Sequence, residues 1–381
     1  MAQNEYINKI IYGNQQIVDL TGVTVDESTL LQGYTAHSAN GEPIIGTRTN
    51  ETQVDRLVVT VNPNKINYHK YQSVDYTGIE ITAYSPDGFE KVVTEDCTYI
   101  PVQNSILESS GTIPLTLRYR GKTTTVNVIV DNVDYIPSWS NGTDEEIMYA
   151  LDRHYADDID LTEHWDIGDE RVIQMSATQE GSSGTPYEGM EAQPEQNLTM
   201  VLMNAGGKEL VTPINGHTEC AFIVGQKYTF VNTGMLVNAN YNSYVWSTCT
   251  RRNWFNTWFR DALTDFAKSI FKLHINSAGE SASYSTPVFT EDYFACIAEK
   301  EIFGTNTLGN ADGEAYLSQF DYFKDASNRI KVNPSTGAVS NWHTRTIVNN
   351  NTSSGAGINT SGVAYTVTVR TKIGMIGFGV I

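Results

Sequence analysis

The chain has 381 residues, which is enough for two or three domains with separate hydrophobic cores. Its 44 acidic and 25 basic side chains leave a formal charge of −19, and a field of that sign repels nucleic-acid backbones and anionic lipid. No apolar run approaches the roughly 20 residues of a membrane helix, and the start, MAQNEYINKI, lacks the pattern of a signal peptide. We therefore expect a soluble protein made in the cytoplasm that binds no nucleic acid and inserts into no membrane.

The four cysteines, Cys97, Cys220, Cys249 and Cys296, show no Cys-x-x-Cys spacing of the kind that holds zinc or carries redox chemistry. We expect them to be buried free thiols.

Residues 1–52 contain short apolar stretches followed by the Asn40-Gly41 dipeptide and the sequence EPIIGT, which predicts a β-hairpin. The segment has too few large apolar side chains to bury a core of its own, so we expect it to complete itself against another chain or another copy. For His37 we expect a packed or turn-bonding role, because no nucleophile or acid accompanies it in this segment. The candidate docking residues are Leu30, Leu31, Tyr34, His37, Ile44 and Ile45.

The string KIIYGNQQIVDLTGVTVDESTLLQGYTAHSANGEPIIGT, residues 9–47, resembles the N-terminal module of many structural proteins of phages that infect Firmicutes. The shared features are a strand that ends in DLT, a TLL-x-G-x-TAH stretch and a G-x-PI-x-GT hairpin. The resemblance implies a virion protein that is attached to the particle through residues 1–52.

Residues 53–132 consist of short runs of alternating polar and apolar residues, separated by Pro, Gly and Asp, which predicts a sandwich of about seven strands. This part resembles a bacterial immunoglobulin-like domain, most clearly in YSPDG at 84–88, and the resemblance implies a spacer.

We expect a linker at residues 133–142 and a single α+β domain at 143–381. Thr143 and Glu146 form a capping box that predicts a helix, with Ile147, Met148, Leu151 and Tyr155 on its apolar side. Strands are predicted at 165–175 and 196–207, joined by a Gly- and Ser-rich loop. A helix is predicted at 251–272, with Trp254, Trp258, Leu263, Phe266, Ile270 and Phe271 on one buried face. The glycines of the closing segment, Gly374, Gly377 and Gly379, predict a strand packed where side chains must be small.

This last domain resembles phage and bacterial domains with a C-type-lectin-like fold, of the formylglycine-generating-enzyme-like, DUF6273-like kind. The resemblance rests on the order of HWDIGDERVIQMSA, LTMVLMN, WSTCTRRNWFNTWFRDAL, EKEIFG, NWHTRTI and IGMIGFGVI. Relatives usually carry a Trp-Trp-Leu-Arg-Ser stretch where residues 342–346 read Trp-His-Thr-Arg-Thr. That departure leaves the expected fold intact and makes any shared ligand doubtful.

We expect no enzyme, no cofactor and no metal. The chain has no His-Glu-x-x-His, phosphate-binding loop or nucleophile elbow, its seven histidines are scattered, and it lacks the sugar-binding triplets of calcium-dependent lectins. Asn310, Asp312 and Glu314 alternate like ligands of a calcium loop, although a solvated polar turn is the favoured interpretation.

Aromatic and amide side chains suit recognition of glycans or protein epitopes. The candidate ligand-binding residues are Tyr241, Tyr244, Trp246, Trp342, His343, Arg345, Asn349, Asn350 and Asn351. The alternative is that Trp342 and Arg345 belong to the scaffold and that the Asn-rich stretch is a polar connection. Arg251, Arg252 and Arg260 are expected to pair with carboxylates rather than to bind nucleic acid.

Together these features predict a multidomain, β-rich surface protein of a virion, of the tail-fibre or receptor-binding type, forming a homotrimer. Its partners would be other virion proteins and a glycan or protein of the host surface. A capsid decoration or head-fibre protein is the alternative, and a glycan-processing or oxidative enzyme is a more distant one. The sequence does not distinguish head from tail.

Overall fold

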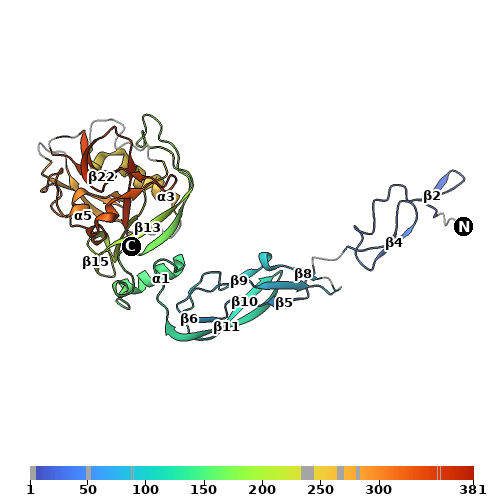
Figure 1. Cartoon of the computed structure of the whole chain (residues 1–381). Coiled ribbons are helices and arrows are strands. Elements are labelled where there is room, and N and C mark those ends of the chain that lie inside the picture. Colours follow the sequence, from blue (N-terminus) through green and yellow to red (C-terminus); the bar gives the residue numbers. More distant parts are fainter. Residues whose placement is uncertain are drawn as a thin grey trace. The chain divides into compact units, whose positions relative to one another are not determined.

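The computed structural model describes residues 6–48, 53–86, 88, 90–232, 244–263, 270–279, 284–349, 351 and 353–381. It has 39% strand and 14% helix, so the expected β-rich class is confirmed. The chain divides into two compact units, Met1–Tyr135 and Ile136–Ile381, here called unit 1 and unit 2 (Figure 1). In the described part of the chain, no helix has the length and apolar character needed to cross a membrane.

The N-terminal segment, residues 6–48, consists of two antiparallel hairpins. β1 (Lys9–Tyr12) pairs with β2 (Gln15–Asp19), and β3 (Thr35–His37) pairs with β4 (Pro43–Ile45). The second is the predicted hairpin, and its turn uses a positive φ at Gly41. A ring nitrogen of His37, Nδ1, lies 3.1 Å from the Gly41 carbonyl oxygen, so the expected turn-bonding role of His37 is confirmed.

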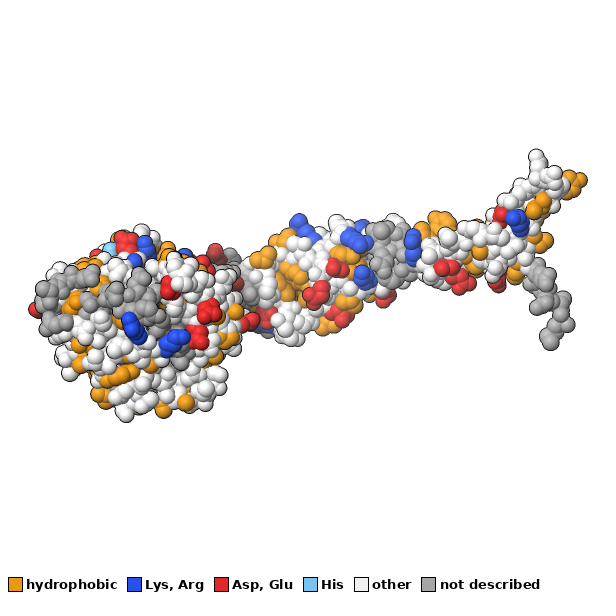
Figure 2. Space-filling model, turned by 90° about the horizontal axis from the view of Figure 1, so that it is seen from above, with side chains coloured by type: hydrophobic (Ala, Val, Ile, Leu, Met, Phe, Trp, Pro, Cys, Tyr) orange, Lys and Arg blue, Asp and Glu red, His pale blue; other side chains and the backbone are white. Residues whose placement is uncertain are grey.

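Among the large hydrophobic side chains of residues 6–48, only Ile44 is buried. Leu30 and Leu31 are partly buried, whereas Tyr34 and Ile45 are about two-thirds exposed. Figure 2 shows hydrophobic side chains in orange on the surface of this end of the chain. The hydrophobic side chains more than 40% exposed in the two hairpins and beside them are Tyr6, Ile7, Ile10, Ile11, Tyr12, Ile17, Tyr34 and Ile45. The segment therefore has almost no core, as its composition predicted.

The rest of unit 1 has two sheets, with seven strands in its described residues. The first has the order β6 (Asn67–Lys70), β11 (Lys122–Asp134), β10 (Gly111–Tyr119) and β9 (Thr98–Ile100). The second has the order β5 (Arg56–Val61), β7 (Glu80–Tyr84) and β8 (Glu90–Val92), and a short 3-10 helix, η1 (Thr94–Asp96), precedes β9. Both sheets contribute to one core, in which Ile81 of β7 and Leu115, Leu117 and Val128 of the β10–β11 pair are fully buried. The number of strands matches the prediction.

Residues 133–142, expected to be a linker, are in fact structured. β11 continues to Asp134, and the side chain of Trp139 is fully buried in the core of unit 2. The Pro137 carbonyl accepts a hydrogen bond from the indole N–H of Trp165 at 2.8 Å. Unit 2 therefore begins at Ile136 and not at Thr143, because Trp139 is one of its core residues.

Unit 2 begins with α1 (Asp144–Tyr155), and both hydrogen bonds of the predicted capping box between Thr143 and Glu146 are present. Ile147, Leu151 and Tyr155 are buried, as the helical spacing predicted. The short 3-10 helix η2 (Leu161–Glu163) follows.

Three sheets form most of unit 2. The antiparallel five-stranded sheet has the order β12 (Glu170–Met175), β13 (Gln196–Ala205), β16 (Phe222–Gln226), β26 (Gly377–Val380) and β19 (Ala295–Cys296). The second sheet has the order β15 (His217–Glu219), β14 (Glu209–Ile214), β17 (Leu273–Ala278) and β18 (Pro287–Asp292). The third has the order β24 (Ala364–Thr368), β23 (Ser354–Ile358), β22 (Trp342–Ile347) and β25 (Gly374–Met375). The smaller elements are η3 (Trp246–Thr248), α5 (Glu299–Phe303), η5 (Asp321–Lys324), η6 (Ala326–Arg329), β20 (Lys331–Val332) and β21 (Val339–Ser340).

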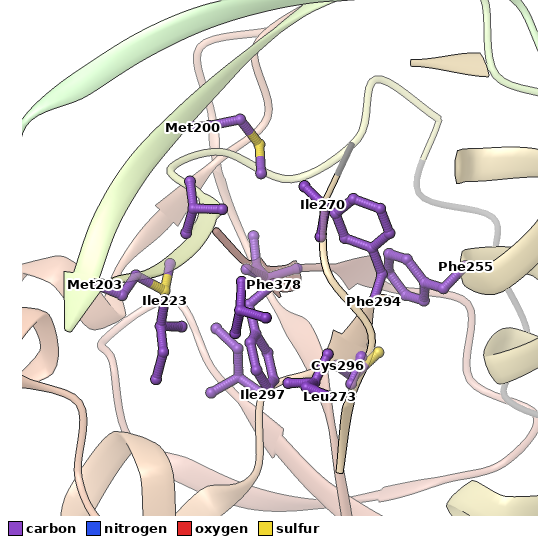
Figure 3. Packing of buried hydrophobic residues seen from close by; sticks show 14 of the residues in the cluster. Met200, Met203, Ile223, Phe255, Ile270, Leu273, Phe294, Cys296, Ile297 and Phe378 are labelled. Atoms are coloured by element: carbon purple, nitrogen blue, oxygen red, sulfur yellow. The ribbon is translucent and has the colours of Figure 1, made fainter. Parts of the chain in front are cut away.

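The C-terminal strand β26 lies in the middle of the core, among the side chains in Figure 3. A methyl group on Gly377 would lie 2.4 Å from the Phe255 ring, and one on Gly379 would lie 2.9 Å from Ile270. The expected close packing of the closing strand is confirmed.

The helix predicted at 251–272 is shorter and less regular than expected. α2 (Thr250–Trp254) leads into a π-helical turn, η4 (Phe255–Phe259), then into α3 (Arg260–Ala262), and Leu263 is already extended. Phe266 lies outside the described residues. Because a π-helical turn brings residues i and i+5 to the same side, the Phe259 ring stacks with that of Trp254 at a centroid distance of 5.4 Å. Trp258, predicted to be buried, is consequently left partly exposed.

The cysteines are free, as predicted. Cys220, Cys249 and Cys296 are buried, and burial raises the pKa of Cys296 to about 11. Cys97 is only partly buried, which corrects the expectation for that residue.

Candidate functional site

Five of the predicted ligand-binding residues, Tyr244, Trp246, Trp342, His343 and Arg345, lie in the interior of unit 2, each at most 1% exposed. That prediction is therefore wrong for these five as surface contacts, since none of them presents a face to a ligand in solution. Tyr241 and Asn350 lie outside the described residues.

Tyr244 and His343 form a buried hydrogen-bonded pair. The Tyr244 hydroxyl lies 2.8 Å from Nδ1 of His343, and Nε2 of the same ring lies 2.9 Å from the Thr371 carbonyl oxygen. The ring therefore donates through Nε2 and accepts at Nδ1. Burial and the nearby charge of Arg251 hold the pKa of His343 well below its usual range, so the imidazole is neutral and serves to fix the ring positions.

Arg345 is the centre of a buried ionic cluster. Its guanidinium donates to both carboxylate oxygens of Glu301, at 2.6 and 2.8 Å, and to the Cys296 carbonyl at 2.6 Å. Lys208 donates to the same carboxylate at 2.5 Å. Burial would raise the pKa of Glu301, but the charges of Arg345 and Lys208 and the hydrogen bonds outweigh it and lower that pKa to about 2. The scaffold alternative for Arg345 is the one that fits this geometry.

Trp246 is likewise a scaffold residue. Its indole N–H donates to the buried carboxylate of Asp292 at 2.9 Å, and Arg252 reaches the other oxygen of that carboxylate at 2.7 Å.

Of the three arginines expected to pair with carboxylates, Arg252 forms such a pair, with Asp292. Arg251 instead donates to the Thr344 carbonyl, and the guanidinium of Arg260 lies 3.9 Å from the centre of the Tyr293 ring.

The stretch around Asn310 is a hydrogen-bonded turn. The side-chain oxygen of Asn310 accepts from the backbone N–H groups of Asp312 and Gly313, while the buried Glu314 accepts from Thr346 and Asn306. No group of three or more potential metal ligands occurs among the residues that the structure describes. Asn310 and Asp312 lie in a polar turn, as expected, but Glu314 is fully buried, which corrects the expectation of a solvated turn for that residue.

The two described asparagines of the predicted Asn run also take part in hydrogen bonds, Asn351 within its own turn and Asn349 with the distant stretch around Leu308. Asn351 accepts from the Ser353 N–H and donates to the Ser354 hydroxyl, and the Asn349 N–H donates to the Leu308 carbonyl. They shape the turn that precedes β23. Both asparagines are exposed.

A cleft that the sequence analysis did not predict lies in unit 2 at the C-terminal end of β12. Its volume is about 230 Å³, and it is lined by Ser176, Ala177, Thr178, Gln179, Trp258, Asp261 and Ala262. Two segments meet there, because the Ser176 N–H donates to the Ala262 carbonyl at 2.7 Å and Met175 forms a β-bridge with Leu263. We call it the Trp258 cleft.

The indole of Trp258 is held in place by a second aromatic ring. It stacks on Tyr187 of the 178–195 loop, with ring centroids 4.1 Å apart and an angle of 22° between the planes.

Unit 1 contains two clefts of about 360 and 370 Å³ at strand ends, and the only aromatic side chain in their linings is Tyr119. Among these three clefts, only the Trp258 cleft combines a stacked aromatic platform with a carboxylate, hydroxyls and an amide. The sequence analysis did not predict this cleft because regular helical spacing places Trp258 on the buried face with Trp254. The π-helical turn that changes this spacing leaves no recognisable pattern in the sequence.

The model of a domain of unknown function, DUF6273, matches residues 223–375, which lie within unit 2. That match includes Trp258, Asp261 and the Arg345–Glu301 pair. No curated protein matches the chain.

Proposed function

We propose that the chain is a non-enzymatic surface protein of a phage virion, of the tail-fibre or receptor-binding type and homotrimeric. In this proposal the N-terminal segment anchors it to the particle, and the seven-stranded part of unit 1 acts as an immunoglobulin-like spacer. Unit 2, as a lectin-like domain, would present an adhesion site to the host surface.

The observation that carries the proposal is the contrast in packing along the chain. Residues 6–48 expose most of their large apolar side chains and bury only Ile44 among them, whereas unit 2 has an extensive core of its own. Exposed apolar patches of this kind are typical of protein interaction sites. An anchored adhesin requires two different parts: an N-terminal segment that needs a partner, and a C-terminal domain that folds by itself.

The Trp258 cleft supports the adhesion part of the proposal. Partly exposed aromatic rings offer a large contact area with little loss of conformational freedom on binding. Repetition on one particle strengthens weak contacts, because the second and later contacts form at high effective concentration.

The location is tested on particles of the phage that encodes the chain, with gold-labelled antibodies against unit 2 and electron microscopy. Label at the tail tip supports the proposal, and label over the capsid supports the head-fibre alternative. Label absent from particles that carry all their other proteins contradicts both.

Adhesion is tested by adding the fluorescent full-length chain to host cells. We expect saturable binding that the Trp258→Ala substitution weakens and the Phe289→Ala substitution does not, because Phe289 is a half-exposed aromatic residue of unit 2 outside the cleft.

Incubation of the chain with host-cell glycans tests the alternative of a glycan-processing enzyme. Release of reducing ends would contradict the non-enzymatic assignment.

A further inference from the structure

The residues that line the Trp258 cleft restrict the chemical class of ligand that it can bind. Its seven residues include one carboxylate, Asp261, and no lysine or arginine. The nearest arginine in sequence, Arg260, lies over the Tyr293 ring and is not part of the lining. In a chain of formal charge −19, a cleft of this composition repels phosphates and uronates.

The polar groups of the cleft match hydroxyl groups. The Asp261 carboxylate is a pure acceptor when ionised, and no hydrogen bond or ion pair to another described residue engages it. The Thr178 hydroxyl already accepts from the Gln193 N–H at 3.0 Å, so its own proton is available to a ligand. The Gln179 amide offers both a donor and an acceptor, and Ser176 adds a hydroxyl.

The apolar part of the cleft is a flat surface. The stack with Tyr187 covers one face of the Trp258 indole and fixes the plane of the ring, while the rest of the indole lines the cleft. The volume of about 230 Å³ is below the roughly 300–1,000 Å³ of pockets for drug-sized ligands, so it suits one ring of a larger molecule.

We propose that the Trp258 cleft binds a single neutral pyranose residue of a surface glycan. The C–H face of the sugar packs on the Trp258 indole, and its hydroxyls bond to Asp261, Thr178 and Gln179. This inference rests on the proposed adhesion function and specifies its ligand class.

Tryptophan fluorescence of the full-length chain tests the inference directly. Trp139, Trp165, Trp246, Trp254 and Trp342 are at most 2% exposed, so Trp258 is the tryptophan that acrylamide reaches. The probes are methyl glucoside, methyl galactoside and N-acetylglucosamine as neutral pyranoses, with glucuronic acid and glycerol phosphate as anionic counterparts.

At least one neutral pyranose is expected to shield Trp258 from acrylamide at millimolar concentration. The Asp261→Asn substitution should weaken its binding several-fold, and Trp258→Ala should weaken it at least tenfold when binding is followed by saturation-transfer NMR. Phe289→Ala is the matched control and should leave the affinity unchanged. Unchanged thermal unfolding of the variants excludes loss of the fold as the cause.

Several results overturn the inference. One is stronger protection by an anionic probe, and another is sugar binding that persists in Trp258→Ala. If no neutral pyranose binds although the chain still adheres to host cells, the ligand class is wrong and the adhesion function stands. If adhesion to cells itself is absent, the proposed function fails independently of the sugar experiment.

Discussion

The guanidinium of Arg345, on β22, binds the carboxylate of Glu301, on α5, through two hydrogen bonds of 2.6 and 2.8 Å in the interior of unit 2. Both side chains are at most 1% exposed. Such a buried pair contributes little net stability relative to apolar residues, but it makes the loss of either partner costly.

Substitution of Glu301 by Gln is therefore expected to destabilise unit 2 by about 3–5 kcal/mol, because it leaves the charges of Arg345 and Lys208 without their counterion. Denaturant unfolding followed by tryptophan fluorescence measures the change. Asp321→Asn, which removes an exposed ion pair with Lys324, is the control and should leave the midpoint unchanged. A loss below about 1 kcal/mol would contradict the importance of the cluster.

The same pair predicts the response to acid. The pKa of Glu301 lies at about 2 in the folded chain and at its ordinary 4.5 when unfolded. Its contribution to stability is thus fully present above pH 4.5 and is lost as the pH falls toward 2. The difference in unfolding free energy between wild type and Glu301→Gln should shrink over that range.

Some of this architecture could be predicted from the sequence because the signals are local. The Asn40-Gly41 turn and the capping box of Thr143 and Glu146 act within a few residues of chain, and the structure contains both elements. The glycines of the last strand were also informative, since Gly377 and Gly379 exclude side chains at close contacts.

The candidate site was less predictable, because strings of aromatic and polar residues look alike whether they face solvent or complete a buried network. Tyr244 and His343 are 99 residues apart in the chain and pair only after folding. The exposure of Trp258 depends on a π-helical turn, which periodicity does not reveal.

Lys331 predicts an unusual dependence of stability on alkaline pH. It is 1% exposed, with Nζ 5.0 Å from the centre of the Tyr322 ring and 5.3 Å from that of Phe323. Burial, reinforced by the like charge of Lys227, lowers the pKa of Lys331 to about 7. Between pH 7 and 10.5 the unfolded chain binds more protons at this residue, so stability rises with pH across that window.

The Lys331→Met substitution should remove this slope and stabilise unit 2 at pH 7 by on the order of 4 kcal/mol. Unfolding free energies of wild type and variant at pH 6.5, 8 and 9.5 or so, spanning the window set by the shifted pKa, measure the effect. Lys372→Met removes an exposed lysine of the same unit and is the matched control. A gap between wild type and Lys331→Met that stays constant with pH would show that the buried amine does not titrate as described.

The contact between Gly377 and Phe255 predicts strong coupling between the two positions. Gly377→Ala brings a methyl group to 2.4 Å from the Phe255 ring and should cost about 1–3 kcal/mol through overpacking. Phe255→Leu alone opens space in the core and is also destabilising. The double variant should be more stable than the sum of the two losses implies, and additive losses would rule out the contact as the cause.

The turn at Gly41 allows the N-terminal segment to be tested without disturbing the rest of the chain. Gly41 has a φ of 79°, and a methyl group there would lie 2.3 Å from the Ile7 carbonyl oxygen, so Gly41→Ala strains the β3–β4 hairpin twice over. Hydrogen exchange should show lost protection in residues 35–45, with the unfolding of unit 2 unchanged. Gly22→Ala, where a methyl group meets no atom within 4 Å, is the matched control in the same segment.

If residues 6–48 anchor the chain, Gly41→Ala also abolishes its association with phage particles, while Gly22→Ala retains it. Equal retention by both variants would contradict anchoring through this hairpin.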